Sequence, residues 1–347
     1  MTIQADCSIG FRKEATYGTI VVPNRFLEFT SETLDLNRTY FQGENLRPGS
    51  RVARSSKRIV TQEGVTGAIT QEVQTKGFGA LFELLLGSVV SGPTQVGTGS
   101  GVFQSVFALS KDDYLPSVTI QKGVPRLGAN VVDALTFAGC QAESFDLSID
   151  SAGVLMLTSN WTGGKKVDTD TAYAVPSYPV GCELFSYVGA SIALGGTVTP
   201  PTATALATGG TEVANVRSWS LNVAQSLDSN GYNIGSRGER SRPAAMGIAA
   251  ITGSMTIEYD TTVITDAVID ETGLALVLTF EGPTPIGGSG QRPVVQVVIP
   301  EVKLDADLPK SAGGDVITHS TTYTGLDPLK TGVQPMYLVY RSADTAL

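Results

Sequence analysis

The sequence predicts a mainly β protein built from two tandem domains, and three observations support this. First, the 347 residues include 39 glycines and many Thr, Val and Ser, which are typical of strands and turns. Second, few long segments have the periodicity of an amphipathic helix. Third, residues 49–87 recur at residues 235–273. A chain of this length can bury two hydrophobic cores.

The repeat is ungapped and has eleven identities in 39 positions, where average composition gives about two or three. The identical pairs are Gly49/Gly235, Ser50/Ser236, Arg51/Arg237, Arg54/Arg240, Ser55/Ser241, Thr66/Thr252, Gly67/Gly253, Thr70/Thr256, Glu72/Glu258, Thr75/Thr261 and Gly87/Gly273. We interpret this similarity as a tandem duplication.

Each copy predicts a strand, then a helix with an N-cap, and then a glycine that ends the helix. Residues 65–73 read VTGAITQEV, in which apolar and polar side chains alternate. The helix that follows has one apolar face, formed by Phe78, Leu81, Phe82 and Leu85. Thr75 and Thr261 precede the helical patterns and suit N-caps. Gly87 and Gly273 follow them, where a positive φ is often needed.

Short strands separated by turn residues are predicted around these units. They are residues 25–36, 103–109, 117–123, 133–139, 143–150 and 153–163 in the first half, and residues 274–282, 293–300, 302–308 and 315–325 in the second. The last strands correspond, because Trp161-Thr162-Gly163 matches Tyr323-Thr324-Gly325. Pro176 and Pro179 suit a linker. We therefore expect a first domain over residues 1–180 and a second over residues 181–347.

Two polar loops precede the repeated strands, and both are rich in arginine. The first, residues 37–63, contains Arg47, Arg51, Arg54 and Arg58, and the second, residues 226–249, contains Arg237, Arg240 and Arg242. Loops of this length are usually functional or disordered. Duplication of a loop together with its arginines suggests a contact made twice by the same chemistry. A solvated loop held by local turns is the alternative.

Composition argues against several classes of function. The formal net charge of −9 disfavours a protein that grips nucleic acid by neutralising phosphates, although it allows one that lets nucleic acid pass. Only 16% of residues are charged, against about 25% on average, so we expect partners to cover much of the surface. Cys7, Cys140 and Cys182 are widely spaced and predict small buried thiols. Without a visible signal peptide or membrane span, we expect a soluble protein made in a reducing cytoplasm.

Catalytic chemistry is poorly supported. The single histidine, His319, lies in a Thr-rich strand without ligand spacing, and no nucleophile or phosphate-binding motif is present. The neighbouring carboxylates Asp112 and Asp113 suit a solvated loop better than an acid and base pair. We therefore predict no enzyme, with no catalytic residues, no cofactor and no metal site.

Five segments carry a further signal in their order along the chain. They are FRKEATYGTIVVP, TYFQGENLRPGSRVARSSKR, GAITQEVQTKGFGALFELLLGSV, FAGCQAESFDLSIDSAGVLMLTSNWTG and YPVGCELFSYVGASI. Taken together they resemble siphophage tail tube proteins, also called major tail proteins, over nearly the whole chain. The resemblance implies a β-sandwich or split-barrel domain with a flanking helix, and rings stacked into a tube through which DNA leaves the virion. It also implies a place in the virion tail, with a tape measure protein and tail-end proteins as partners.

The resemblance also implies roles for particular residues. A long loop between early strands reaches the adjacent ring, which corresponds to residues 40–58 and, by the internal copy, residues 229–242. Their arginines are then the inter-ring contacts, namely Arg47, Arg51, Arg54, Arg58, Arg237, Arg240 and Arg242. We expect the repeated strands to line the lumen, with Glu72 and Glu258 facing it. Acidic walls repel phosphate, so DNA would slide without sticking.

Several alternatives stay open. Single-domain relatives form hexameric rings, so a duplicated chain suits a trimer with pseudo-sixfold symmetry, while a hexamer with the second half outside is the other arrangement. A virion surface protein or adhesin that binds host glycans is a second function. It predicts aromatic clusters at loop tips, whereas Trp161 and Trp219 lie in strand-like patterns. A glycan-active enzyme is a third, but no acid pair on an aromatic-rich groove is evident.

Overall fold

The protein is mainly β, as the sequence predicts, with 19 strands and two short α-helices in the described part of the chain. The structure is a computed structural model that describes residues 4–49, 51–128, 131–212, 215–259, 262–305, 308–309, 313 and 316–347. Ser50 and Thr261 of the repeat, and part of the strand predicted at residues 302–308, lie outside these ranges.

The elements follow one another in two series. Before residue 180 they are η1 (Gln4–Asp6), β1 (Ser8–Lys13), β2 (Arg25–Phe26), β3 (Ser31–Glu32), β4 (Asp35–Gln42), η2 (Ser55–Lys57), β5 (Arg58–Glu72), α1 (Gly79–Leu86), β6 (Gly87–Gln95), β7 (Phe103–Leu109), β8 (Val118–Pro125), β9 (Val132–Asp150), β10 (Met156–Gly164) and β11 (Lys166–Asp168). After it they are η3 (Tyr187–Gly189), β12 (Ala190–Thr199), β13 (Thr208–Glu212), β14 (Val216–Ala224), β15 (Ala250–Glu258), α2 (Val263–Ile269), β16 (Leu274–Glu281), β17 (Val294–Leu304), β18 (Thr318–Gly325) and β19 (Tyr337–Ser342).

The order of strand pairing in the first half recurs in the second. The first half runs β1, β8, β9, β10, β5, β4, each strand antiparallel to the next. The second half runs β12, β16, β17, β18, β15, β14, again antiparallel. The hairpin of β6 and β7 follows α1, and β16 follows α2 directly. A tandem duplication produces this kind of recurrence.

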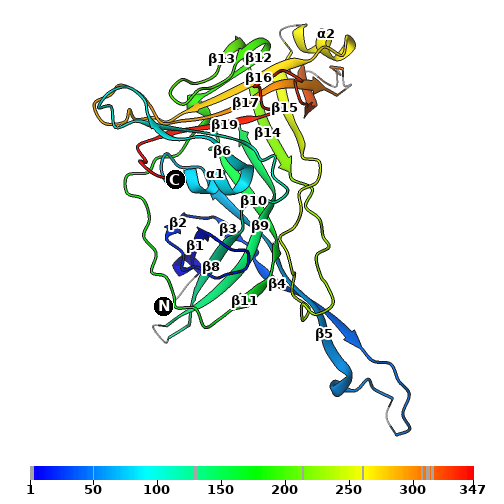
Figure 1. Ribbon diagram of the computed structural model, residues 1–347. Helices are drawn as coiled ribbons and strands as arrows, with labels where there is room; N and C mark the ends of the chain where they lie inside the picture. Colours follow the sequence, from blue (N-terminus) through cyan, green and yellow to red (C-terminus); the bar gives the residue numbers. More distant parts are fainter. Residues whose placement is uncertain are drawn as a thin grey trace.

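The two halves join edge to edge in one sheet. Residues 144–150 of β9 pair with β14, while β9 also pairs with β10. Eight strands are thereby placed side by side in the order β4, β5, β10, β9, β14, β15, β18, β17, and the sheet stays open (Figure 1). A second link pairs β7 of the first half with β19 of the second.

One face of this sheet is buried in a hydrophobic core that includes residues of both halves. The apolar face of α1 packs into it through Leu81, Phe82 and Leu85, and α1 contacts β6, β7 and β9. The aromatic residues Trp161 and Tyr323 project into the same core from β10 and β18.

The repeated glycines make room for closely packed neighbours, which are Tyr323 at Gly253 and the backbone of Leu34 at Gly67. Gly67 lies opposite Trp161, and Gly253 lies opposite Tyr323. A Cβ on Gly253 would approach Tyr323 to 2.3 Å, and one on Gly67 would approach the backbone of Leu34 to 2.5 Å. The glycine of the repeated Thr-Gly pair therefore has a packing role in both halves.

The expected helix caps are only partly correct. Gly87 ends α1 in the left-handed conformation, with φ of 79°. Thr75 is not the N-cap, because α1 starts after Phe78 and the Thr75 hydroxyl instead accepts a hydrogen bond from the Glu183 backbone. In the second half Asp270 caps α2, so the Gly273 prediction is wrong.

Candidate functional site

The open face of the eight-stranded sheet carries short polar side chains. Strand alternation turns Val65 and Ile69 of β5 to the core and Thr66, Thr70 and Glu72 to this face. The same alternation holds along the other strands. We call this surface the polar face, and it comprises Ser31, Thr33, Asp35, Asn37, Thr66, Ala68, Thr70, Glu72, Met156, Thr158, Asn160, Thr162, Ser144, Asp146, Ser148, Asp150, Ser218, Ser220, Asn222, Ala224, Ala250, Thr252, Ser254, Thr256, Glu258, Thr318, Ser320, Thr322, Thr324, Lys303 and Asp305.

Side chains of the polar face hydrogen-bond to one another across the strands. Hydroxyl pairs join Thr70 to Thr158 at 3.2 Å, Ser220 to Ser254 at 2.8 Å and Thr256 to Ser320 at 3.0 Å. The Asn160 amide donates to Ser144 at 2.9 Å, and the Asn222 amide donates to Asp146 at 2.7 Å across the junction of the halves. These cross-strand bonds hold the polar side chains in fixed positions and use part of their bonding capacity.

Carboxylates outnumber cations on the polar face. The acidic residues are Asp35, Glu72, Asp146, Asp150, Glu258 and Asp305, while the list above contains one basic residue, Lys303. Arg217, on the bulge at the start of β14, adds a cation at the margin and forms an ion pair with Glu258 at 2.6 Å. The surface is therefore negative overall.

Glu72 and Glu258 occupy equivalent places on the polar face. Glu72 pairs in register with Met156 of β10, and Glu258 pairs with Thr318 of β18. Their surroundings differ, because Arg217 beside Glu258 corresponds to Thr30 in the first half. The ion pair partly neutralises the second glutamate.

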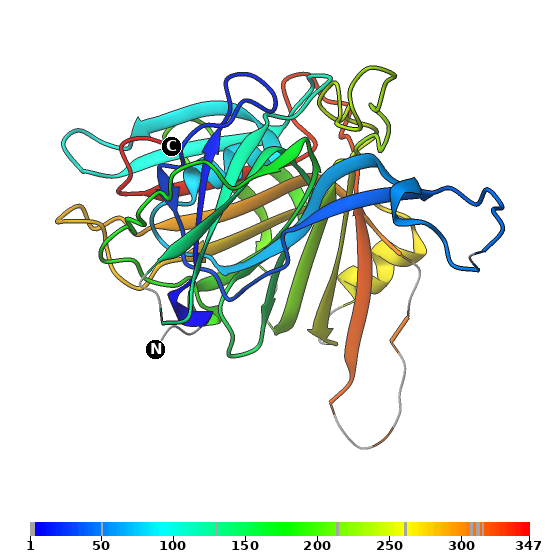
Figure 2. The same cartoon turned by 90° about the horizontal axis from the view of Figure 1, so that it is seen from below.

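The first arginine loop lies at the end of the long hairpin of β4 and β5, which we call the arm. Strands β4 and β5 pair as far as Gln42 and Arg58, and the hairpin projects away from the body in both views (Figures 1 and 2). The Arg58 guanidinium lies 4.1 Å from the Tyr40 ring centroid, in cation–π geometry. Arg47 and Arg51 are exposed and Arg54 is half-buried. Apolar side chains are also exposed on the arm, at Phe41, Leu46, Val52, Ile59 and Val60.

The second arginine loop instead folds back on the body. The Glu63 amide of β5 donates to the Gly238 carbonyl at 2.8 Å. Arg240 is 4% exposed and donates to the carbonyls of Asp228 and Asn230 in its own loop, so this structure does not present it to another ring as expected. Arg237 is exposed.

Arg242 is also engaged within the second loop. It forms an ion pair with Asp228 at 2.6 Å. Hydrogen bonds from the Asn230 backbone, and then from Arg242, lower the pKa of the Asp228 carboxyl below its usual range. The Asp228 carboxylate thus holds two parts of the loop together.

A comparison with protein families decides what kind of protein this surface belongs to. The family model described as phage tail tube protein matches residues 4–325 of the 347 residues. The chain belongs to the phage tail tube protein family. No curated protein matches the chain.

Members of the tail tube family are structural proteins of the virion. The family implies self-assembly into a tube and a place in the virion tail. A structural family suggests a non-enzymatic role. Neither α-helix in the described ranges combines the length and apolar character needed to traverse a bilayer.

The repeat identifies six residues of the polar face, namely Thr66, Thr70, Glu72, Thr252, Thr256 and Glu258. Sequence reasoning misses most of the others, including Asp146, Asn222 and the serines. Their signal is the alternation of small polar with large apolar residues in SFDLSID of β9 and SWSLNVA of β14. That alternation identifies a strand with one buried face, but it does not tell which strands are neighbours.

Proposed function

We propose that the chain polymerises as stacked rings that form the tail tube, with the polar face turned to the lumen through which DNA is ejected. The observation that carries this proposal is the polar face itself. Its side chains are short, hydrogen-bonded to one another and negative overall. Such a wall repels phosphates and presents few free hydrogen-bond donors to them, so DNA passes through the tube without being bound.

We further propose that the two halves are tandem domains, residues 1–180 and 181–347, that act as equivalent building blocks. The recurring strand order and the edge-to-edge junction of β9 with β14 support this. Each half supplies four neighbouring strands to the sheet. Three chains then complete a pseudo-sixfold ring of 24 strands, which removes the exposed sheet edges.

The arm supplies the contact between rings in this proposal. It projects far from the body and exposes both apolar side chains and arginines, which suits a surface that becomes covered. The inter-ring residues are Arg47, Arg51, Arg54 and Arg58 of the arm, with Arg237 and Arg242 of the second loop. Arg240 is left out, because it is buried in its own loop.

The adhesin alternative is not favoured. It requires aromatic residues exposed at loop tips, and both tryptophans of the chain, Trp161 and Trp219, are 2% exposed.

The test replaces the equivalent exposed residues Thr66 and Thr252 with lysine. We expect the double variant to form tubes by electron microscopy, since both side chains lie on the polar face. Its tubes should retain double-stranded DNA in a salt-dependent way, because lysine neutralises phosphate. The matched control replaces both residues with glutamine. Dispersed particles from the unmodified protein, or equal DNA retention by the lysine and glutamine variants, would overturn the proposal.

A further inference from the structure

The second arginine loop, residues 226–249, crosses from its own half of the chain to the first half. The Ala244 amide donates to the Gln141 side chain of β9 at 2.6 Å, and the Met246 amide donates to the Asp113 carbonyl at 2.9 Å. Gln141 is fully buried, so water does not compete for the first of these bonds. The returning part of the loop is therefore fixed to the first half.

The tip of the same loop reaches the root of the arm, where β5 leaves the sheet. Strand β4 lies on one side of β5, and on the other side β10 pairs with β5 only as far as Val65. The Gly238 carbonyl takes the next place along this edge, because it accepts the Glu63 amide at 2.8 Å. A Cβ on Gly238 would lie 3.1 Å from the Thr61 carbonyl, so the backbone of the loop packs directly on β5.

A β-bulge lies at this contact. Thr39 of β4 lies opposite Gln62 of β5. The next residue, Tyr40, lies opposite Val60, which leaves Thr61 as an extra residue in β5. A bulge bends a strand and increases its local twist. Beyond it β5 pairs with β4 alone within the described residues, and an isolated two-stranded hairpin is marginally stable in water. The direction of the arm therefore depends on what holds the chain near Thr61.

Arg240 closes the tip of the second loop. It forms an antiparallel bridge with Tyr232, and its guanidinium lies 5.6 Å from the Tyr232 ring centroid. The same guanidinium donates to the carbonyls of Asp228 and Asn230. The turn between Tyr232 and Arg240 contains Gly238, so Arg240 fixes the segment that contacts β5.

Building on the proposed function, we infer that the second arginine loop is a brace that fixes the direction of the arm, with Arg240 as a positioning residue for the contact between rings. The first copy of the duplicated loop reaches the neighbouring ring, and the second copy holds the first in place. The matched residues Arg54 and Arg240 then have different tasks. An arm held in one direction loses less conformational entropy when it docks, so the brace strengthens docking through contacts inside one chain.

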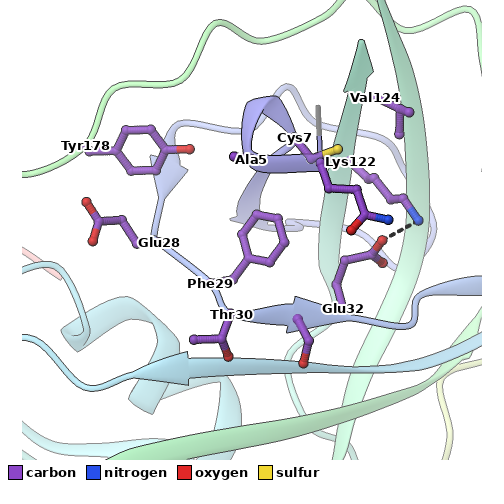
Figure 3. Close-up of a pocket in the computed structure, with 11 residues that line it drawn as sticks. Ala5, Cys7, Glu28, Phe29, Thr30, Glu32, Lys122, Val124 and Tyr178 are labelled. Atoms are coloured by element: carbon purple, nitrogen blue, oxygen red, sulfur yellow. Dashed lines mark ion pairs between the residues drawn. The ribbon is translucent and has the colours of Figure 1, made fainter. Parts of the chain in front are cut away.

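The experiment measures the direction of the arm in unassembled protein. Spin labels are attached at Leu46→Cys near the tip of the arm and at Thr252→Cys of β15, which are exposed positions. Pulsed electron paramagnetic resonance gives the distribution of distances between the labels. Cys7 lines a cavity of about 720 Å³ beside β3, where a label can reach it, so it is replaced by serine together with the half-buried Cys182 (Figure 3). The buried Cys140 stays.

Gly238→Ala is the test variant, and Gly235→Ala is its matched control. Both glycines have a positive φ, of 87° and 99°, so alanine causes backbone strain at each. They differ in their surroundings, because a Cβ on Gly238 meets the Thr61 carbonyl, whereas a Cβ on Gly235 meets open space. We expect Gly238→Ala to push the brace off β5 and to broaden the distance distribution, while Gly235→Ala leaves it narrow.

Arg240→Gln is a second test of the brace. It removes the guanidinium that closes the turn, so it should also broaden the distance distribution. Ile234→Gln is the control, because Ile234 is fully exposed in the same turn. Circular dichroism establishes that each variant is folded. Gly238→Ala should in addition raise severalfold the protein concentration needed to form tubes, since a mobile arm loses more entropy on docking.

A distance distribution that is unchanged in both Gly238→Ala and Arg240→Gln would refute the brace, whether or not tubes form. A broader distribution with unchanged tube formation would refute its role in docking, and with it the arm as the contact between rings. Absence of tubes from the unmodified protein would count against the proposed function alone, because the distance measurement needs no tubes.

Discussion

At the scale of single residues, identity in the repeat marks two different kinds of constraint. Gly253 is required because Tyr323 fills the space where a Cβ would be. The Tyr323 hydroxyl donates to the Ser220 carbonyl at 2.9 Å. Thr66 and Thr252 are exposed and belong to the polar face. The sequence showed both identities, but only the cross-strand register separated the packing residue from the surface residue.

Gly253→Ala should therefore destabilise the protein. The added methyl group would force Tyr323 out of its buried position, which we expect to cost about 1–3 kcal/mol in the free energy of unfolding. Gly288→Ala is the control, because a Cβ there meets open space and no positive φ is required. Denaturant unfolding of both variants measures the effect. Equal stabilities would contradict the packing role of Gly253.

At the scale of elements, similar sequences adopt different structures in the two loops. In the first, the pairing of β4 with β5 continues along the arm as far as Gln42 and Arg58. In the second, the pairing stops close to the body, because β14 ends at Ala224 and β15 begins at Ala250. Arg54 and Arg240 are matched residues of the repeat, yet Arg54 lies on the arm and Arg240 is buried against carbonyls of its own loop. Sequence similarity predicted a shared contact, but the backbone path decided which arginines are exposed.

Acid should loosen the second loop. Hydrogen bonds to the carboxylate lower the Asp228 pKa in the folded protein. The ionised Asp228 therefore stabilises the folded loop fully above the usual carboxyl pKa, and this stabilisation is lost as the pH falls through the lowered pKa. We expect limited proteolysis with an acid-active protease to cut residues 226–249 faster towards pH 2. In Asp228→Asn this contribution to the pH dependence should be missing. An identical pH profile for both proteins would argue against the role of Asp228.

At the scale of the whole molecule, the halves are joined too closely to behave independently. They share the strand pairs of β9 with β14 and β7 with β19, and one core cluster includes residues of both. The Gln225 side chain of the second half donates to the Leu85 carbonyl of the first at 3.0 Å in the interior. Separation would expose apolar surface on each half.

We therefore expect the two halves to unfold in one cooperative transition. Each half has a single tryptophan, Trp161 or Trp219, so Trp161→Phe and Trp219→Phe leave one fluorescent reporter in a known half. In each variant the fluorescence midpoint in denaturant should coincide with the midpoint from far-ultraviolet circular dichroism. Two separated transitions would indicate that the halves fold independently.

The sequence by itself determined the mainly β class, the family resemblance, the repeated unit and the presence of Glu72 and Glu258 on matching strands. These features depend on local alternation, turn residues and identity at a fixed spacing, all of which are readable along the chain. Only the tertiary structure decided that β9 lies beside β14, that Asp146 and Asn222 meet on one face, and that Arg240 is buried. Those facts depend on pairing between residues far apart in the chain, and neither alternation nor composition encodes which strands become neighbours.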